Sequence, residues 1–192
     1  RYETVVREPF KIFVQELISR MNEIDSSIAI QPKDAIFRIN RDIRFAKDKS
    51  PYKINRSAII SPNGRKDKTT PGLYFEFTPE YVRIYGGVYQ LTTAQVLDVR
   101  NTIANDLKGF GKLIMAKDFQ DSYGEIKGEK AKRIPKELKE LAEEQDLIFN
   151  KNWYYYMELP PETILDKDLA DIIIESYLKA QPVTEFFSKI LK

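Results

Sequence analysis

The sequence predicts an α+β fold, in which an antiparallel sheet packs with helices from the N- and C-terminal parts of the chain. Three observations predict it. Apolar residues recur at helical spacing near the start of the chain and again near its end. Between these regions, alternating apolar and polar residues mark short strands. These strands follow one another closely in the chain, which favours antiparallel pairing.

The first helix is predicted over residues 2–21. Its apolar residues share one helical face: Val6, Phe10, Phe13, Val14, Leu17, Ile18 and Met21. Pro9 either kinks this helix or marks its first turn. Residues 28–39 are predicted to be extended, and residues 57–61 to form a short apolar strand.

The clearest strand signal follows. The odd-numbered residues of 73–77 are apolar and share one face, with Tyr and Glu on the other. Residues 78–80 (Thr-Pro-Glu) form a turn, and residues 81–89 return as the second strand of an antiparallel hairpin. Gly86 and Gly87 within it indicate a bulge, or a place where other atoms approach the backbone closely.

Helices dominate the second half. Thr92 and Gln95 form the pattern of a capping box and begin one helix. Gly109 and Gly111 are predicted to end it. Further helices are predicted over residues 112–119, from Pro135 to Glu144, over residues 166–180 and in a short last segment ending at Leu191. The aromatic run 152–159 is predicted to be a strand that packs on both faces.

Composition excludes several function classes. The 192 residues suffice for one domain over 1–192, and they contain no Cys and no His. Thiolate chemistry, Ser-His-Asp triads and histidine or cysteine metal sites are therefore excluded. The sequence identifies no catalytic residue, no metal site and no cofactor. No apolar run approaches the roughly 20 residues of a membrane span, so we expect a cytoplasmic protein without a membrane partner.

The basic charge is concentrated in residues 38–56, called the basic segment below. It holds seven Arg or Lys and two acidic residues, Asp42 and Asp48, in a chain of net charge +2. Such a segment, with turn-forming residues between its cations, suits a phosphate- or carboxylate-bearing small molecule. Nucleic acid is a second partner class, although a general nucleic-acid binder carries a larger positive field.

The periodicity of this segment allows two structures. A strand would place one set of residues on a single face: Phe37, Ile39, Arg41, Ile43 and Phe45. Arg41 would then be less exposed than Lys47 and would need a carboxylate partner, such as Asp42 or Asp48. A helix, with Ile36, Ile39 and Ile43 on one stripe, also fits.

The same residues carry a resemblance. The run NRDIRFAKDKSPYK resembles the signature R-D-x-R-F-x-K-D-K-x-P-Y-K of the uncharacterised family called domain of unknown function 2461. The matching residues are Arg41, Asp42, Arg44, Phe45, Lys47, Asp48, Lys49, Pro51, Tyr52 and Lys53. The resemblance implies that the basic segment is a hallmark of the family, and that further residues precede Arg1. It implies no activity, cofactor or catalytic residue.

The best functional hypothesis is the binding of an anionic ligand by this segment together with cations and a tyrosine from later in the chain. The candidate ligand-binding residues are Arg38, Arg41, Arg44, Lys49, Tyr52, Lys53, Tyr89, Arg100 and Arg133. In one alternative the protein is an enzyme, with Asp42 or Asp48 as base or metal ligand. In the other, the segment only stabilises the fold of a structural or interaction protein, and residues such as Arg100 form surface ion pairs.

Overall fold

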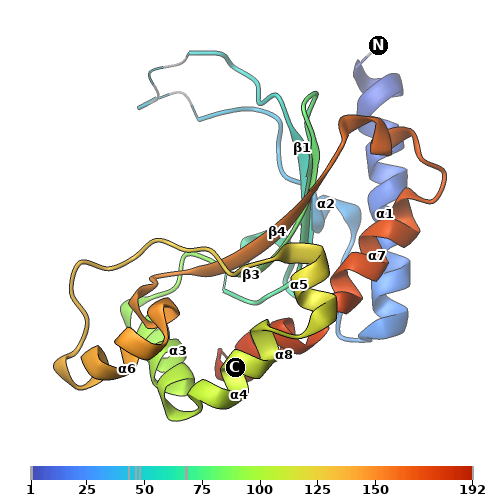
Figure 1. The fold of residues 1–192 in the computed structure, drawn as a ribbon. Coiled ribbons are helices and arrows are strands. Elements are labelled where there is room, and N and C mark those ends of the chain that lie inside the picture. The colour runs from blue at the N-terminus through green and yellow to red at the C-terminus, as the bar shows by residue number, and fades with distance from the viewer. Residues whose placement is uncertain (1, 43, 46, 48, 68, 192) are drawn as a thin grey trace. The chain divides into compact units, whose positions relative to one another are not determined.

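The computed structural model describes residues 2–42, 44–45, 47, 49–67 and 69–191. It confirms the α+β fold: four strands form one antiparallel sheet in the order β1-β2-β3-β4, and helices pack with it (Figure 1). The strands are β1 (Arg56–Ile60), β2 (Leu73–Phe77), β3 (Val82–Val88) and β4 (Trp153–Leu159). The predicted hairpin of β2 and β3 is confirmed, and the Thr78 N–H donates to the Tyr81 carbonyl to close its turn.

Along the chain, two α-helices precede β1, four lie between β3 and β4, and two follow β4 in the described residues. They are α1 (Glu8–Ile24), α2 (Pro32–Ala35), α3 (Thr93–Asn105), α4 (Leu107–Ile114), α5 (Lys117–Tyr123), α6 (Lys139–Glu144), α7 (Leu169–Lys179) and α8 (Gln181–Ile190). A π-helical turn, Glu3–Arg7, precedes α1, and Pro9 lies in the first turn of α1. Pro9 thus lies where the π-helical turn passes into α1, and its missing N–H interrupts the α-helical hydrogen-bond pattern there.

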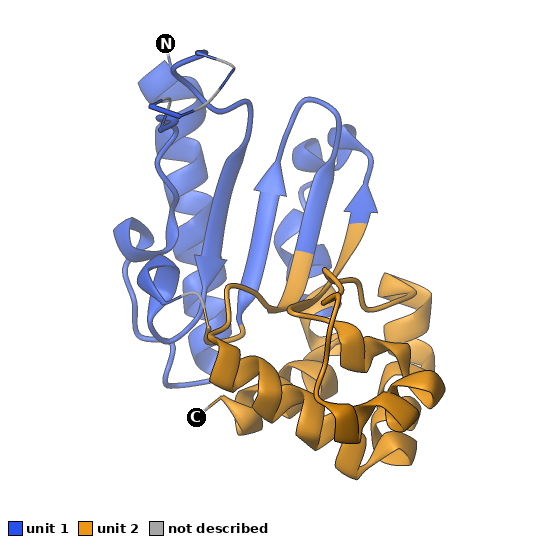
Figure 2. Cartoon of the chain, turned by 90° about the vertical axis from the view of Figure 1, so that its left-hand side faces the viewer, with its two compact units in different colours: residues 1–67, 72–84, 158–175 blue, residues 68–71, 85–157, 176–192 orange. Residues whose placement is uncertain are grey.

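The chain divides into two compact units (Figure 2). Unit 1 comprises residues 1–67, 72–84 and 158–175, and unit 2 comprises residues 68–71, 85–157 and 176–192. The division passes through β3 and β4. The single domain expected from the sequence stays a prediction, and each unit is described by itself.

In unit 1, α1 covers one face of the sheet. Phe10 and Phe13 from α1 meet the rings of Phe75 and Phe77, with ring centroids 5.7–6.0 Å apart. The pairing of β1 with β2 sets which side chains reach this face, since Ala58 lies opposite Phe75 in the register. Burial of these side chains gives unit 1 its core.

The core of unit 2 gathers around β4. Trp153 and Tyr155 are fully buried, and the Tyr155 hydroxyl lies 2.9 Å from the hydroxyl of Thr184 in α8. Tyr154 and Tyr156 alternate with them and stay half-buried. The predicted strand with side chains packed on both faces is thus confirmed.

Two close approaches to this strand account for the paired glycines. A Cβ at Gly86 would lie 2.5 Å from the ring of Tyr155, and one at Gly87 would lie 2.1 Å from the carbonyl oxygen of Trp153. Gly87 also has φ +104°, in the region that favours glycine. Of the two alternatives predicted for this pair, a bulge or a close approach of other atoms, the close approach is observed.

The helix boundaries around Gly109 differ from the prediction. Thr92 caps α3 with Gln95 as predicted, but Gly109 and Gly111 do not end it, because both lie inside α4. Asp106 separates the helices: its carboxylate accepts the Gly109 N–H at 2.8 Å and so caps α4. The helix predicted over residues 112–119 is accordingly two helices, α4 and α5.

Candidate functional site

The basic segment, in unit 1, contributes residues to both arms of an irregular antiparallel ribbon. Isolated bridges join Ile36 to Ala58 and Asn40 to Tyr52. The Arg41 N–H donates to the Pro51 carbonyl at 2.9 Å. Residues 36–41 are therefore extended rather than helical beyond α2, and backbone hydrogen bonds hold both arms of the ribbon.

The predicted strand face is correct in its first half. Phe37, Ile39 and Arg41 are half-buried, whereas their neighbours Arg38 and Asn40 are exposed. The predicted order holds, since Arg41 is less exposed than Lys47. The face does not continue to Phe45, which is 95% exposed, because the chain bends at Arg44 and Phe45. Ile43 and Asp48 lie outside the described residues.

Asp42 is engaged by Arg44. The Arg44 guanidinium donates from Nε to Oδ1 at 2.9 Å and from its terminal nitrogen to Oδ2 at 2.6 Å. These hydrogen bonds lower the pKa of Asp42. A lower pKa makes the carboxylate a weaker base, so the contact with Arg44 does not favour Asp42 as the base of the enzymatic alternative.

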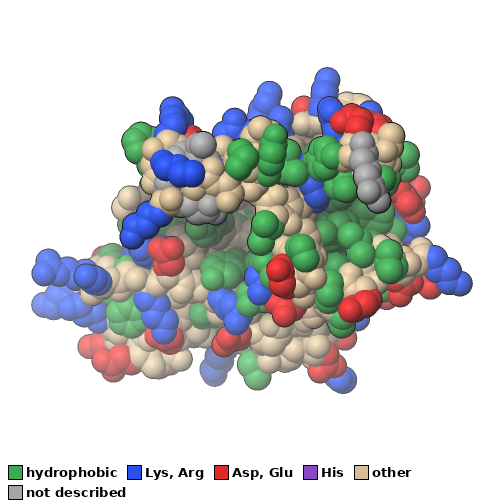
Figure 3. Space-filling view, turned by 90° about the horizontal axis from the view of Figure 1, so that it is seen from above, with side chains coloured by type: hydrophobic (Ala, Val, Ile, Leu, Met, Phe, Trp, Pro, Cys, Tyr) green, Lys and Arg blue, Asp and Glu red, His purple; other side chains and the backbone are tan. Residues whose placement is uncertain are grey.

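The tip of the ribbon combines cations with apolar side chains. Arg38, Arg44, Lys47 and Lys49 are exposed, beside Phe45 and the 58% exposed ring of Tyr52. Seen from above, blue cationic and green hydrophobic side chains lie next to one another on this face of the molecule (Figure 3). Cations of this kind bind phosphate or carboxylate oxygens, and exposed rings stack on planar groups.

Unit 1 also contains a second group of polar side chains, which is called the Glu76 cluster below and which includes Asn55 of the basic segment. Its members are Asn55, Tyr74, Glu76, Tyr81, Arg83 and Glu158. Glu76 is 8% exposed, and its carboxylate accepts hydrogen bonds from the Asn55 amide at 2.8 Å and from the hydroxyls of Tyr74 at 3.1 Å and Tyr81 at 3.2 Å. A buried carboxylate needs such donors to remain charged.

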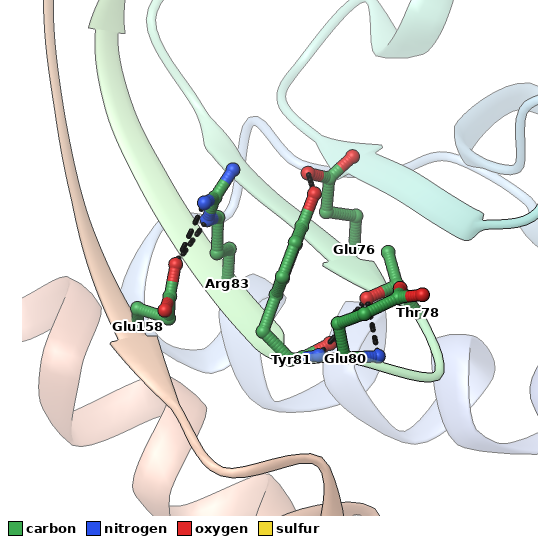
Figure 4. A network of polar contacts seen from close by, with 6 residues as sticks. All are labelled: Glu76, Thr78, Glu80, Tyr81, Arg83 and Glu158. Atoms are coloured by element: carbon green, nitrogen blue, oxygen red, sulfur yellow. Dashed lines mark hydrogen bonds and ion pairs between the residues drawn. The ribbon is translucent and has the colours of Figure 1, made fainter.

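Tyr81 and Arg83 extend the cluster along β3 (Figure 4). The Thr78 hydroxyl accepts the N–H groups of Glu80 and Tyr81, which fixes the turn before Tyr81. The Arg83 guanidinium lies 3.8 Å from the centre of the Tyr81 ring and pairs with Glu158 at 2.7 Å. Burial and the neighbouring Glu76 charge raise the pKa of Tyr81, so this hydroxyl remains a donor at neutral pH.

The Glu76 cluster was not among the predicted site residues. Alternation in residues 73–77 does place Tyr74 and Glu76 together on the face opposite the apolar one. It does not reveal that Asn55 and Tyr81 reach the same carboxylate, because that depends on how β1 and β3 flank β2.

The remaining candidates, Tyr89, Arg100 and Arg133, belong to unit 2. Tyr89 is half-exposed and packs edge-on against Tyr154, and Arg133 is exposed. Arg100 is 7% exposed, and its guanidinium donates to the carbonyls of Phe149 and Asn150 at 3.0–3.3 Å. The surface ion pair expected for Arg100 is therefore wrong, because the chain following α6 folds over this side chain and supplies carbonyl acceptors.

Replacing Arg100 by Met is expected to lower the free energy of unfolding by about 1.5–3 kcal/mol, since the substitution deprives buried carbonyls of a charged donor. Urea unfolding monitored by circular dichroism measures the loss. Arg133→Met is the matched control and should change stability by less than about 0.5 kcal/mol, because Arg133 is exposed. Equal stability of the two variants would contradict the structural role of Arg100.

In residues 2–42, 44–45, 47, 49–67 and 69–191, no three His, Cys, Asp or Glu side chains come together in a way that could hold a metal ion. None of the helices in those ranges has the length and apolar composition needed to cross a membrane.

Comparison with known families agrees with the signature in the basic segment. A family model described as "Conserved hypothetical protein (DUF2461)" matches residues 1–186. The chain belongs to the DUF2461 family. The resemblance identified from residues 41–53 is thereby confirmed. No curated protein and no solved structure matches the chain. Since the family description states no activity, function has to be argued from the geometry.

Proposed function

We propose that the protein binds an anionic ligand, bearing phosphate or carboxylate, through the basic segment. The observation that carries this proposal is the exposed group of cations at the tip of a ribbon whose arms are held by backbone hydrogen bonds. The hydrogen-bonded arms fix the backbone at Arg41 and Lys53, so these two cations lose little conformational freedom on binding, which favours affinity. The proposal retains the cytoplasmic location expected from the sequence.

The charge distribution supports an anion over other ligands. Seven of the 31 basic residues lie in these 19 positions, whereas only two of the 29 acidic residues do. Asp42 pairs with Arg44, and Arg38 and Lys47 are exposed. A local positive field of this kind raises the concentration of anions at the tip and increases their association rate.

Thermal unfolding at low salt tests the proposal. Pyrophosphate, ribose 5-phosphate and citrate should raise the melting temperature of the wild-type protein, because a ligand that binds the folded state alone stabilises it. We expect Arg44→Ala/Lys49→Ala to lose most of this shift. Added salt should reduce it, since exposed charges are screened.

The matched control is Lys108→Ala/Lys112→Ala, which removes two exposed cations from α4, outside the basic segment. It should keep the ligand-induced shift of the wild type. A shift of equal size in Arg44→Ala/Lys49→Ala, or no shift with any of the three anions, would overturn the proposal and leave the structural role of the segment as the better account.

A further inference from the structure

A strip of aromatic side chains leads from the basic segment along the sheet of unit 1. The Lys53 ammonium lies 5.9 Å from the centre of the Phe37 ring, and that ring lies 5.9 Å from the ring of Tyr74. Tyr74 and Tyr81 then share the carboxylate of Glu76. The strip, defined as Phe37, Tyr74 and Tyr81, thus has Lys53 at one end and Arg83, stacked on Tyr81, at the other.

These rings are available to a ligand. In the register of β1 with β2, Tyr74 lies opposite Ile59 and Glu76 opposite Ser57, on the face turned away from α1. All three rings are half-buried, in contrast to Tyr155, which is 1% exposed in the core of unit 2. Half-exposed rings on a sheet resemble the platforms on which proteins stack nucleic-acid bases.

The strip is also held in place before any ligand arrives. Glu76 accepts both tyrosine hydroxyls, and Glu158 holds the guanidinium of Arg83 against the Tyr81 ring (Figure 4). The hydroxyls are oriented inward to Glu76, which leaves ring surface rather than hydroxyl groups for contact. A fixed ring and guanidinium lose little freedom on binding a planar group.

We propose that the ligand is a nucleoside phosphate, either free or within a single strand. Its base stacks on the strip, and its phosphate binds the cations of the basic segment, of which Lys53 lies at one end of the strip. This inference rests on the proposed function, because the phosphate contact is the anion contact described above. It adds a base to the ligand, which the rings recognise and the cations alone do not.

Isothermal titration of the wild-type protein at low salt is the first test. Adenosine 5′-monophosphate should bind roughly tenfold more tightly than ribose 5-phosphate, since stacking on an aromatic ring contributes about that factor for each base. A single-stranded oligonucleotide distinguishes a free nucleotide from a nucleotide within a strand. The logarithm of its association constant should fall against the logarithm of the salt concentration with a slope of about −0.7 per phosphate contact. This slope should be steeper than that of the mononucleotide if several phosphates bind.

Substitutions at Tyr81 separate the ring from its hydroxyl. Tyr81→Leu should remove most of the preference for adenosine monophosphate over ribose 5-phosphate, whereas Tyr81→Phe, which keeps the ring, should retain it. Arg44→Ala/Lys49→Ala should weaken both ligands. Melting curves without ligand establish that each variant is folded, and the wild-type comparison of the two ligands stands without any variant.

The outcomes distinguish this inference from the proposed function. If ribose 5-phosphate binds as tightly as the nucleotide, or if Tyr81→Leu keeps the preference, the base contact is wrong while anion binding survives. If no phosphate binds at all, both fail. Sedimentation with anionic lipid vesicles, without a response to nucleotides, would overturn the inference and assign the exposed Phe45 and its cations to a lipid surface.

Discussion

Replacing Gly87 by Ala is expected to destabilise the protein by more than about 3 kcal/mol. Two effects add. Gly87 has φ +104°, which an alanine adopts only with strain, and the new Cβ would lie 2.1 Å from the carbonyl oxygen of Trp153 and 2.7 Å from the Cα of Tyr154. These atoms belong to the backbone of β4, so no rotation of a side chain relieves the overlap.

The control is Gly111→Ala, inside α4, where an added Cβ meets nothing within 4 Å. It should stabilise the protein by up to about 1 kcal/mol, because alanine favours the helical conformation over glycine. Chemical denaturation of both variants against the wild type measures the difference. Similar stabilities for Gly87→Ala and Gly111→Ala would contradict the close packing of β3 on β4.

Raising the pH above about 10 is expected to destabilise the protein progressively through two tyrosines of unit 2. Burial raises the pKa of Tyr123 and of Tyr155 above the ordinary value of about 10. The Tyr123 hydroxyl also donates to the Ser176 carbonyl at 2.7 Å, which a phenolate could not do. Both hydroxyls therefore stay protonated in the folded state at a pH where the unfolded chain ionises.

Alkaline pH lowers the free energy of unfolding because the unfolded chain releases the tyrosine protons before the folded protein does. Below pH 10 both states keep these protons, so the contribution to stability is complete. Above it the unfolded state releases them first, and each tyrosine lowers the free energy of unfolding by about 1.4 kcal/mol per pH unit until its folded-state pKa is reached. At pH 12 the two together should lower it by about 5 kcal/mol, which is comparable to the stability of many domains.

Tyr155→Phe provides the control for this pH dependence. It removes the contact with Thr184 and should lower stability by about 1 kcal/mol at pH 7. It should also reduce the alkaline slope by about 1.4 kcal/mol per pH unit, since one of the two protons is no longer involved. Urea unfolding at pH 7, 10 and 11 measures both quantities. An unchanged slope would show that Tyr155 ionises in the folded protein.

Local patterns predicted the elements of this fold well. Alternation identified β2 and β3, and the pair Thr92 and Gln95 identified the start of α3, because both signals act within a few residues. The end of α3 was misjudged at Gly109. There, a carboxylate three positions earlier accepts the glycine N–H and begins a new helix, and a Cβ at Gly109 would collide with that carboxylate.

The candidate site was predictable only where its chemistry lies in one stretch of chain. The basic segment and the order of exposure of Arg41 and Lys47 could be read from consecutive residues. Arg100 could not, because its burial depends on residues 149–150, fifty positions away. The Glu76 cluster combines Asn55, Tyr74 and Tyr81 from three segments, so alternation revealed one of its three hydrogen-bond donors.

The strand order has a consequence for how the chain folds. β1, β2 and β3 are neighbours in both sequence and space, so short loops close their pairings. β4 pairs with β3 only after residues 89–152 have been brought back, and closing so long a loop costs more entropy than closing a hairpin. We therefore expect the three-stranded meander to assemble first and β4 to dock late. Trp153 lies in β4, so its burial should occur in the slowest refolding phase and be detected by its fluorescence.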